Sequence, residues 1–194
     1  MSYDRFLQLS REHDVTAIAD VRSAPYSRRF PHFNREILYE ELRADKIAYV
    51  FLGDELGGRP KDSRFFCDGI ADYEQMARVP EFAKGLNRVV EGATRYRIAL
   101  MCSEHDPLDC HRCLLVGRAL RERCITVSHI LSSGATKTQE KIEENLLAMA
   151  GQDQGQTDIF ASHDERLASA YRNRAKKVAY SVALPRPSNV IAAE

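Results

Sequence analysis

The sequence predicts an α/β fold with a mainly parallel sheet and a helical C-terminal extension. Short apolar runs alternate with segments of helical spacing, and this alternation is typical of strand–helix–strand units joined by right-handed crossovers. The chain has 194 residues, of which 44% are hydrophobic and 29% charged, which suits one domain with its own core. We expect residues 1–135 to form the α/β domain and residues 136–194 the helical extension.

In the first half of the chain the elements are short and well separated. Residues 2–13 have the apolar spacing of a helix, and a second helix is predicted from Asn34, its N-cap, through Arg43. Each is followed by an apolar run of strand character, at Val15–Val21 and at Ile47–Leu52. The glycines and proline of the segment DELGGRPKD then predict a loop.

The second half begins with helical spacing over Tyr73–Val90, which Pro80 divides into two pieces. A third strand is predicted at Tyr96–Met101, a helix from Pro107 to Arg123, and a last short strand at Ile125–Ile130. The SSGATKTQ segment then predicts a loop. In the extension we expect helices over Glu140–Met149 and Ala161–Val182, a linker at GQDQGQTD and a disordered end at ALPRPSNVIAAE.

Composition excludes several classes of protein. Lys and Arg total 28, as do Asp and Glu, so no net charge attracts the chain to nucleic acid or membranes. No apolar run is long enough to span a membrane, and the charged N-terminus is unlike a secretory signal peptide. Five cysteines, an odd number in a chain of this size, predict reduced thiols in the cytoplasm.

Polar residues follow each of the first three predicted strands. Because ligands bind at the carboxyl ends of strands in an open parallel sheet, we expect these residues to converge on one site. They are Asp20, Arg22 and Ser23; Gly57, Gly58 and Arg59; and Cys102, Glu104, Cys110, His111 and Arg112.

An arginine-rich segment, SRRFPHF, extends the first of these groups. Ser27, Arg28 and Arg29 lie in a stretch without any acidic residue, and arginine suits the bidentate recognition of phosphate. Tyr26, Phe30 and Phe33, which alternate with the basic residues of this segment, offer faces on which a base can stack. The alternative is a solvated loop whose aromatic residues pack on the core.

The third group allows more than one kind of chemistry. Glu104 and Asp20 can act as bases or nucleophiles, or as salt-bridge partners of arginine, and His111 can transfer protons. Cys102, Cys110 and His111 are candidate ligands for a divalent metal, but zinc sites usually contain paired C-x2-C units, which this chain lacks. Cys110, next to His111 at the predicted start of a helix, is also a candidate reactive thiol. Simple packing of the thiols is the alternative to both.

Three motifs in order, ADVRSAPYSRRFPHFN, YVFLGDELGGRP and ALMCSEHDPLDCHR, followed by VSHIL, resemble those of the domain of unknown function 488 family. The resemblance runs from Asp14 to Leu131 and implies a compact three-layer Rossmann-like domain without an established reaction. Family members usually begin with an extra strand reading roughly T-I-G-H-S, so the resemblance implies a start further upstream or the loss of one strand. The family's signature positions are Asp20, Arg22, Ser23, Pro25, Ser27, Arg28, Phe30, Phe33, Leu56, Gly57, Gly58, Cys102, Glu104, Pro107, Cys110, His111 and Arg112.

These observations favour a small cytoplasmic hydrolase or group transferase that acts on a phosphate-bearing substrate, a nucleotide or nucleic acid. Arg22, Arg28, Arg29 and Arg112 would bind the anion, and Glu104 would act as acid, base or nucleophile. Hydride transfer is disfavoured because no G-x-G-x-x-G motif is present. Two alternatives remain: a metal- or thiol-dependent protein, and a non-catalytic module that binds nucleic acid.

Overall fold

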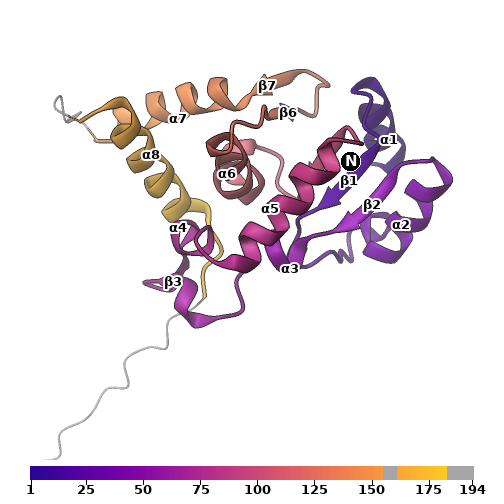
Figure 1. The fold of residues 1–194 in the computed structure, drawn as a ribbon, viewed down its shortest axis with the longest axis horizontal. Helices are drawn as coiled ribbons and strands as arrows, with labels where there is room; N and C mark the ends of the chain where they lie inside the picture. Colours follow the sequence, from indigo (N-terminus) through magenta and orange to yellow (C-terminus); the bar gives the residue numbers. More distant parts are fainter. Residues whose placement is uncertain (155–160, 183–194) are drawn as a thin grey trace, which may run out of the picture.

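A three-stranded parallel sheet forms the centre of the computed structural model, which describes residues 1–154 and 161–182. Its strands are β1 (Ala17–Asp20), β2 (Ala48–Phe51) and β5 (Ile98–Met101), in the order β2-β1-β5 (Figure 1). Asp20, the last residue of β1, pairs with the last residues of both neighbours, so the strands end level. The predicted mixed α/β fold with a parallel sheet is confirmed.

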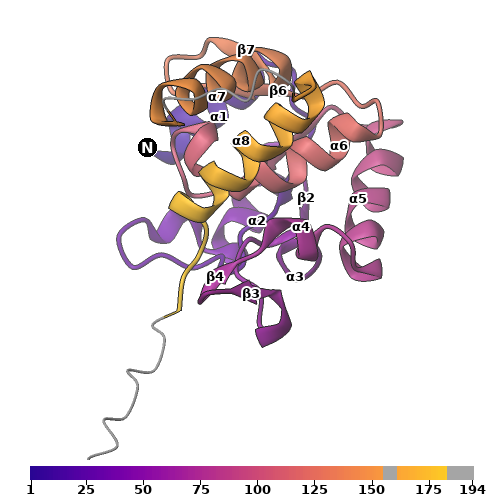
Figure 2. The ribbon, with the colours of Figure 1, turned by 90° about the vertical axis from the view of Figure 1, so that its left-hand side faces the viewer.

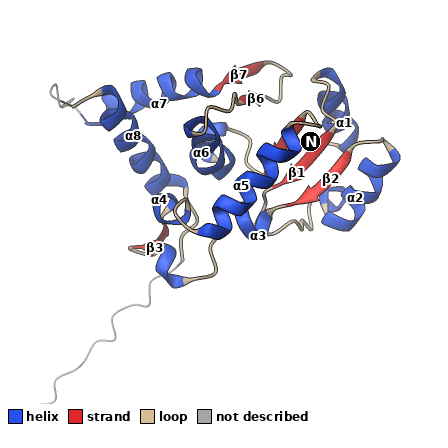
Figure 3. Ribbon diagram, in the orientation of Figure 1, coloured by secondary structure: helices blue, strands red, loops and turns tan. Residues whose placement is uncertain are grey.

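Helices pack against both faces of this sheet, and alternate residues of β1 contact the two sides. Ile18 belongs to a cluster with residues of α1 (Tyr3–Glu12) and α2 (Arg35–Ala44). Ala19 belongs to a larger cluster with α5 (Pro80–Ala93), which lies on the opposite side (Figure 3). The period of two along a strand therefore gives the sheet its two buried faces.

Short elements connect β2 to α5 through the predicted loop. They are α3 (Gly53–Leu56), the 3₁₀ turn η2 (Ser63–Phe65), the hairpin β3 (Phe66–Cys67) and β4 (Ile70–Ala71), and α4 (Tyr73–Met76). A further 3₁₀ turn, η1 (Pro31–Phe33), precedes α2. The predicted division at Pro80 is confirmed, because α4 ends before it and α5 begins there. Asn34 does precede α2, but its side chain accepts a hydrogen bond from the Ser27 backbone instead of capping the helix.

The predicted helix from Pro107 to Arg123 is not continuous. Asp106 accepts a hydrogen bond from the Leu108 backbone and closes a 3₁₀ turn, η3 (Pro107–Asp109), after which Cys110 is extended. A π-helical turn, η4 (Arg112–Gly117), and α6 (Arg118–Glu122) follow. Cys110 therefore lies in a break before the helix and not in its first turn.

The predicted last strand does not join the sheet. β6 (Ser128–Ile130) pairs antiparallel with β7 (Thr136–Thr138), which forms in a segment predicted to be a loop. The turn between them depends on Gly134, whose φ of +93° suits glycine. Within the described residues, β5 therefore has no neighbour on its outer side.

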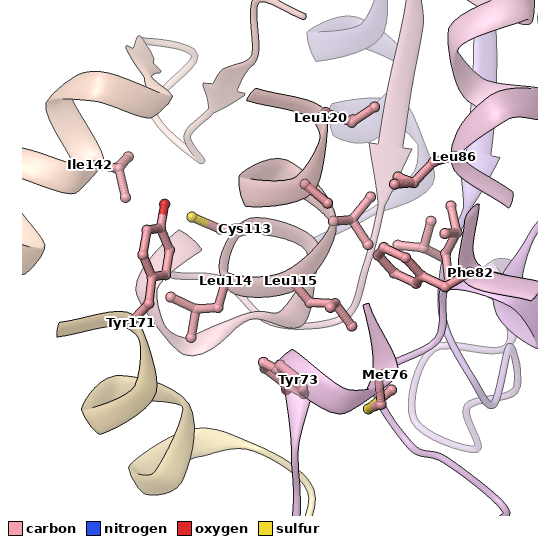
Figure 4. Close-up of a cluster of buried hydrophobic side chains, with 14 of the residues drawn as sticks. Tyr73, Met76, Phe82, Leu86, Cys113, Leu114, Leu115, Leu120, Ile142 and Tyr171 are labelled. Carbon is pink, nitrogen blue, oxygen red and sulfur yellow. The ribbon is translucent and has the colours of Figure 1, made fainter. Parts of the chain in front are cut away.

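The extension consists of α7 (Gln139–Gln154) and α8 (His163–Val178), near the two predicted helices. Ile142 and Tyr171 from these helices belong to the same hydrophobic cluster as Leu114 and Leu115 (Figure 4). The first four residues of the expected linker belong to α7, and the rest of it, like the expected disordered end at 183–194, lies outside the described residues. No described helix combines the length and apolar character needed to cross a membrane.

Candidate functional site

A cavity of about 120 Å³ lies at the carboxyl ends of β1 and β5. Polar residues predicted from different strand ends meet in its wall, among them Arg22, Glu104 and His111. Its lining comprises Arg22, Ser23, Ala24, Gly58, Arg59, Tyr73, Cys102, Ser103, Glu104, Asp109, His111, Val178 and Tyr180. The sheet therefore brings Arg22 and His111, which are 89 positions apart in the sequence, to the same cavity.

Arg22 enters the cavity wall in a fixed orientation. Its Nε and Nη2 atoms donate to the two carboxylate oxygens of Asp20 at 2.8 and 2.6 Å. Tyr49 of β2 donates to the same carboxylate at 2.8 Å. Burial lowers the pKa of Arg22, but the contact with Asp20 outweighs it and raises that pKa, so the guanidinium stays charged. Asp20 is fully buried and is not among the described residues that line the cavity. Its carboxylate holds the Arg22 guanidinium in place.

Two thiols, a carboxylate and an imidazole form a compact cluster beside Arg22. The Sγ atoms of Cys102 and Cys110 donate to Oε2 of Glu104 at 2.7 and 3.2 Å. The Nδ1 atom of His111 lies 3.4 Å from Sγ of Cys102. One ligand atom from each of the four residues lies within 4.8 Å of the others. We call this group the Cys–Glu–His cluster.

The orientation of His111 is set by its backbone contact and by a glycine. Its Nε2 lies 2.9 Å from the carbonyl oxygen of Val21, which can only accept, so Nε2 carries the proton and Nδ1 faces the cluster. Gly58 lies against the ring, because a Cβ there would be 2.5 Å from Cγ of His111. Gly57 packs against Ser23, whose Oγ accepts a hydrogen bond from the Arg59 backbone. The glycine pair therefore brings the loop close to the site.

The two thiols of the cluster differ in pKa and in exposure. The contact with Cys102 lowers the pKa of Cys110 to about 6 against the effect of burial, and His111 and Arg112 lower it further. The same contact with Cys110, together with burial, raises the pKa of Cys102. Burial raises the pKa of Glu104, but the hydrogen bonds from the two thiols outweigh it and lower that pKa. Cys110 is fully buried and is not among the described residues that line the cavity, whereas Cys102 is one of them.

The arginine-rich segment does not reach the cavity. Arg28 and Arg29 are exposed, the latter over the ring of Phe30, and both lie outside the cavity wall formed by the described residues. Ser27 caps the local turn by accepting a hydrogen bond from the Phe30 backbone. Arg112, half-buried on η4, also lies outside that wall and acts on the site through its charge near Cys110.

A family model described as "Domain of unknown function DUF488" matches residues 2–119, which is more than half of the chain. The chain belongs to the DUF488 family. No curated protein and no solved structure gives a significant match. The match to the DUF488 model ends early in α6, so the β6–β7 hairpin and both helices of the extension lie beyond it.

The sequence did not reveal the part of the cavity wall that comes from outside the DUF488 match. The last residue of α8, Val178, and Tyr180 in the segment after it supply this part of the wall, and Figure 2 shows the segment passing beside β4. The Tyr180 carbonyl accepts a hydrogen bond from the Ala71 backbone, and its ring lies under the Arg59 guanidinium. No strand-end motif or charge pattern marked these residues.

Tyr73 on α4 is a second residue that the sequence did not single out. It lines the cavity, and burial followed by the nearby Cys110 and Glu104 raises its pKa, so the phenol stays protonated. In the sequence it marked only the start of a segment with helical spacing. Asp109 was also missed, and it forms an ion pair with Arg174 of α8 at the rim.

Proposed function

We propose that this DUF488 protein is a small enzyme that carries out hydrolysis or group transfer on a phosphate-bearing substrate, and that its domain is a Rossmann-like three-layer fold. The observation that carries the proposal is the cavity itself. It places a fixed guanidinium, that of Arg22, in the same wall as the carboxylate of Glu104 and the imidazole of His111. An anion and the groups that act on it would therefore be held together.

Anion binding rests on Arg22 and Arg59. Arg22 is 6% exposed and is oriented by Asp20, so little side-chain entropy is lost when it binds a ligand. Its pairing with Asp20 leaves Nη1 free of that bidentate contact. Arg59 adds an exposed guanidinium at the rim, where it lies over the Tyr180 ring. Charged hydrogen-bond donors of this kind favour phosphate oxygens.

The size of the cavity limits what can enter it. The cavity volume of about 120 Å³ is well below the roughly 300–1,000 Å³ of pockets that enclose drug-sized ligands. A phosphoryl group fits this space, while the rest of the substrate extends past the rim. A mononucleotide or similar phosphate ester therefore suits the site better than a nucleic acid strand, whose expected contacts, Arg28 and Arg29, lie elsewhere.

Glu104 is the group best placed to take a proton in the cavity. In hydrolysis the oxygen of a water molecule bonds to phosphorus, and the phosphorus–oxygen bond to the leaving alcohol breaks with both electrons going to that oxygen. The proton that Glu104 takes from the water is returned to the leaving oxygen. Group transfer follows the same course with a substrate hydroxyl in place of water.

The test of this proposal combines binding of inorganic phosphate, measured by calorimetry, with turnover of p-nitrophenyl phosphate mono- and diesters. Arg59→Ala is compared with Arg29→Ala, since both arginines are exposed and lie over an aromatic ring, at 5.2 and 5.3 Å. We expect Arg59→Ala to weaken phosphate binding by about 10- to 100-fold, the equivalent of one charged hydrogen bond. Arg29→Ala should have no effect.

Glu104→Gln should abolish turnover and leave phosphate binding in place. The proposal is wrong if the wild-type protein binds no phosphate at millimolar concentration, or if Arg29→Ala weakens binding more than Arg59→Ala. Unchanged turnover in Glu104→Gln would also refute the role given to this carboxylate.

A further inference from the structure

We infer that the Cys–Glu–His cluster binds one thiophilic divalent cation of the zinc class. The ligands are Cys102, Glu104, Cys110 and His111. This inference deepens the proposed function, because it names the group that would act on the phosphoryl oxygen or water, and metal binding can be measured without any substrate.

Two distances within the cluster approach the edges of a tetrahedral site, and all of its ligand atoms lie within 4.8 Å of one another. Zinc bonds of about 2.3 Å to sulfur and about 2.1 Å to nitrogen or oxygen give ligand–ligand edges of about 3.6 Å. The edge from Cys102 to Nδ1 of His111 is 3.4 Å, and that from Cys110 to Glu104 is 3.2 Å. The edge from Cys102 to Glu104, at 2.7 Å, is a thiol–carboxylate hydrogen bond, and it lengthens when the thiol gives up its proton to a metal.

The donor types match one class of metal. Two thiolates with an imidazole select zinc and similar soft or borderline ions, whereas magnesium and calcium require oxygen ligands. A single carboxylate does not alter that preference. The cation also offsets the negative charge that two thiolates and a carboxylate would otherwise concentrate in a partly buried site.

The surroundings hold the imidazole in the orientation that a metal ligand needs. Metal-bound histidines usually donate their other ring N–H to a carbonyl or carboxylate, which fixes the ring and the tautomer. His111 does this through Nε2 to the carbonyl oxygen of Val21, and Gly58 closes off the face of the ring. Nδ1 is thereby directed at the two thiols and the carboxylate.

Other uses of the thiols fit the structure less well. Cys110 is 0% exposed and lies behind the described cavity wall, so it cannot attack a substrate in the cavity. Packing together with a hydrogen bond from the neutral Gln139 amide accounts for Cys113, which is equally buried and belongs to the core cluster. It does not account for Cys102 and Cys110, whose sulfur atoms both contact one carboxylate.

The cluster is open on one side. Cys102, Glu104 and His111 line the cavity, and Cys110 closes the back. Catalytic zinc sites keep a position for water or substrate, whereas structural sites surround the metal with protein ligands. A cation held here by the two thiolates and the imidazole, with Glu104 as the exchangeable fourth ligand, is accessible to an anion that Arg22 binds.

The test measures metal content and cobalt spectra of the full chain. Protein purified without chelators, or reconstituted with zinc after chelation, should hold about one equivalent of zinc by mass spectrometry. Cobalt-loaded protein should show thiolate-to-cobalt charge-transfer absorption and the visible bands of a tetrahedral site. Cys102→Ser and Cys110→Ser should each lower zinc affinity by at least about 100-fold, since even outer-shell changes cost 10- to 100-fold.

Cys113→Ser is the matched control, because Cys113 is also 0% exposed and lies three residues from Cys110. It should retain zinc at wild-type affinity. The inference is overturned if reconstituted wild-type protein holds less than a fifth of an equivalent of zinc, if cobalt gives no charge-transfer band, or if Cys113→Ser loses as much zinc as Cys110→Ser. The wild-type cobalt spectrum decides the question even if a serine variant fails to fold.

The same measurements separate this inference from the proposed function. Stoichiometric zinc in a protein that neither binds phosphate nor turns over an ester would support the metal site and refute the proposed function. Phosphate binding and Glu104-dependent turnover in protein that fails to take up zinc or cobalt on reconstitution would support the function and refute the metal site.

Discussion

Gly58→Ala should disturb the site by pushing against the His111 ring. The added Cβ would lie 2.5 Å from Cγ of His111 and 2.9 Å from its Nδ1, whereas ordinary contacts begin at 3.4 Å. The ring cannot retreat freely, because its Nε2 is bonded to the Val21 carbonyl and its other side faces the thiols. The imidazole or the loop must therefore move by about 0.9 Å.

The cost follows from two effects. Overpacking a well-packed site costs about 1–3 kcal/mol, and loss of the hydrogen bond from His111 to Val21 adds about 1 kcal/mol. We therefore expect Gly58→Ala to lower the free energy of unfolding by about 2–4 kcal/mol. Without the clash the sign would be reversed, since Gly→Ala at an unstrained position stabilises by about 0.4–1 kcal/mol.

Urea denaturation of Gly58→Ala and Gly151→Ala provides the measurement. Gly151 lies in α7, and a Cβ there meets nothing within 4 Å, so this control should be neutral or gain up to about 1 kcal/mol. Zinc content of the folded Gly58→Ala protein gives a second readout, which should fall. A Gly58→Ala protein as stable as wild type would refute the argument that this glycine is required by the His111 ring.

Three further predictions concern buried polar groups, each measured by urea denaturation. Asp20→Asn should lower the free energy of unfolding by about 3–5 kcal/mol, because it leaves the buried Arg22 charge uncompensated. Asp54→Asn, which removes an exposed ion pair, should lower it by less than about 1 kcal/mol. Equal effects of the two substitutions would contradict this prediction. Tyr171→Phe should lower the free energy of unfolding by about 1–3 kcal/mol, since the buried hydroxyl accepts a hydrogen bond from the Gln139 amide and donates one to the Glu143 carboxylate. An unchanged urea midpoint would contradict this prediction. Burial lowers the pKa of His129, so the unfolded chain takes up the proton first and stability should fall below pH 6.5. His129→Gln should weaken that fall between pH 7.5 and 5.5, and an identical pH dependence would contradict the assignment.

The central strands and the polar residues at their ends could be predicted from the sequence, because buried strands require apolar runs. An apolar run such as Val15–Val21 has few alternatives to a buried strand once charged residues bound it on both sides. Parallel strands end at the same edge, so Arg22 and Cys102 had to lie near each other if the sheet was parallel. The role of Gly58 was not accessible, because a close approach between a loop and an imidazole leaves no pattern in the chain.

The predictions that were wrong have another cause. In each case local turns decide the structure, and the spacing of apolar residues does not reveal such turns. At Cys110 the capped turn begun by Asp106 ends before the π-helical turn begins, although the spacing of apolar residues runs through both. At β6 the hairpin turn at Gly134 offers a nearby partner, β7, to a run that looked like a sheet strand. The arginine-rich segment gave a strong charge signal, but charge alone does not specify which face of a loop meets the site.

The contact between the C-terminal extension and the cavity is the feature most difficult to predict, because the interactions that form it leave almost no pattern in the sequence. Backbone hydrogen bonds hold the segment after α8 beside β4, and most residues could form them. What does depend on the sequence is the docking of α7 against α8, where Gln139 and Glu143 both hydrogen-bond to the Tyr171 hydroxyl. That buried network fixes the path of α8 and so places Tyr180 against Arg59. The cavity therefore cannot be reconstructed from residues 2–119 alone, because one of its walls is set by packing that lies beyond the DUF488 match.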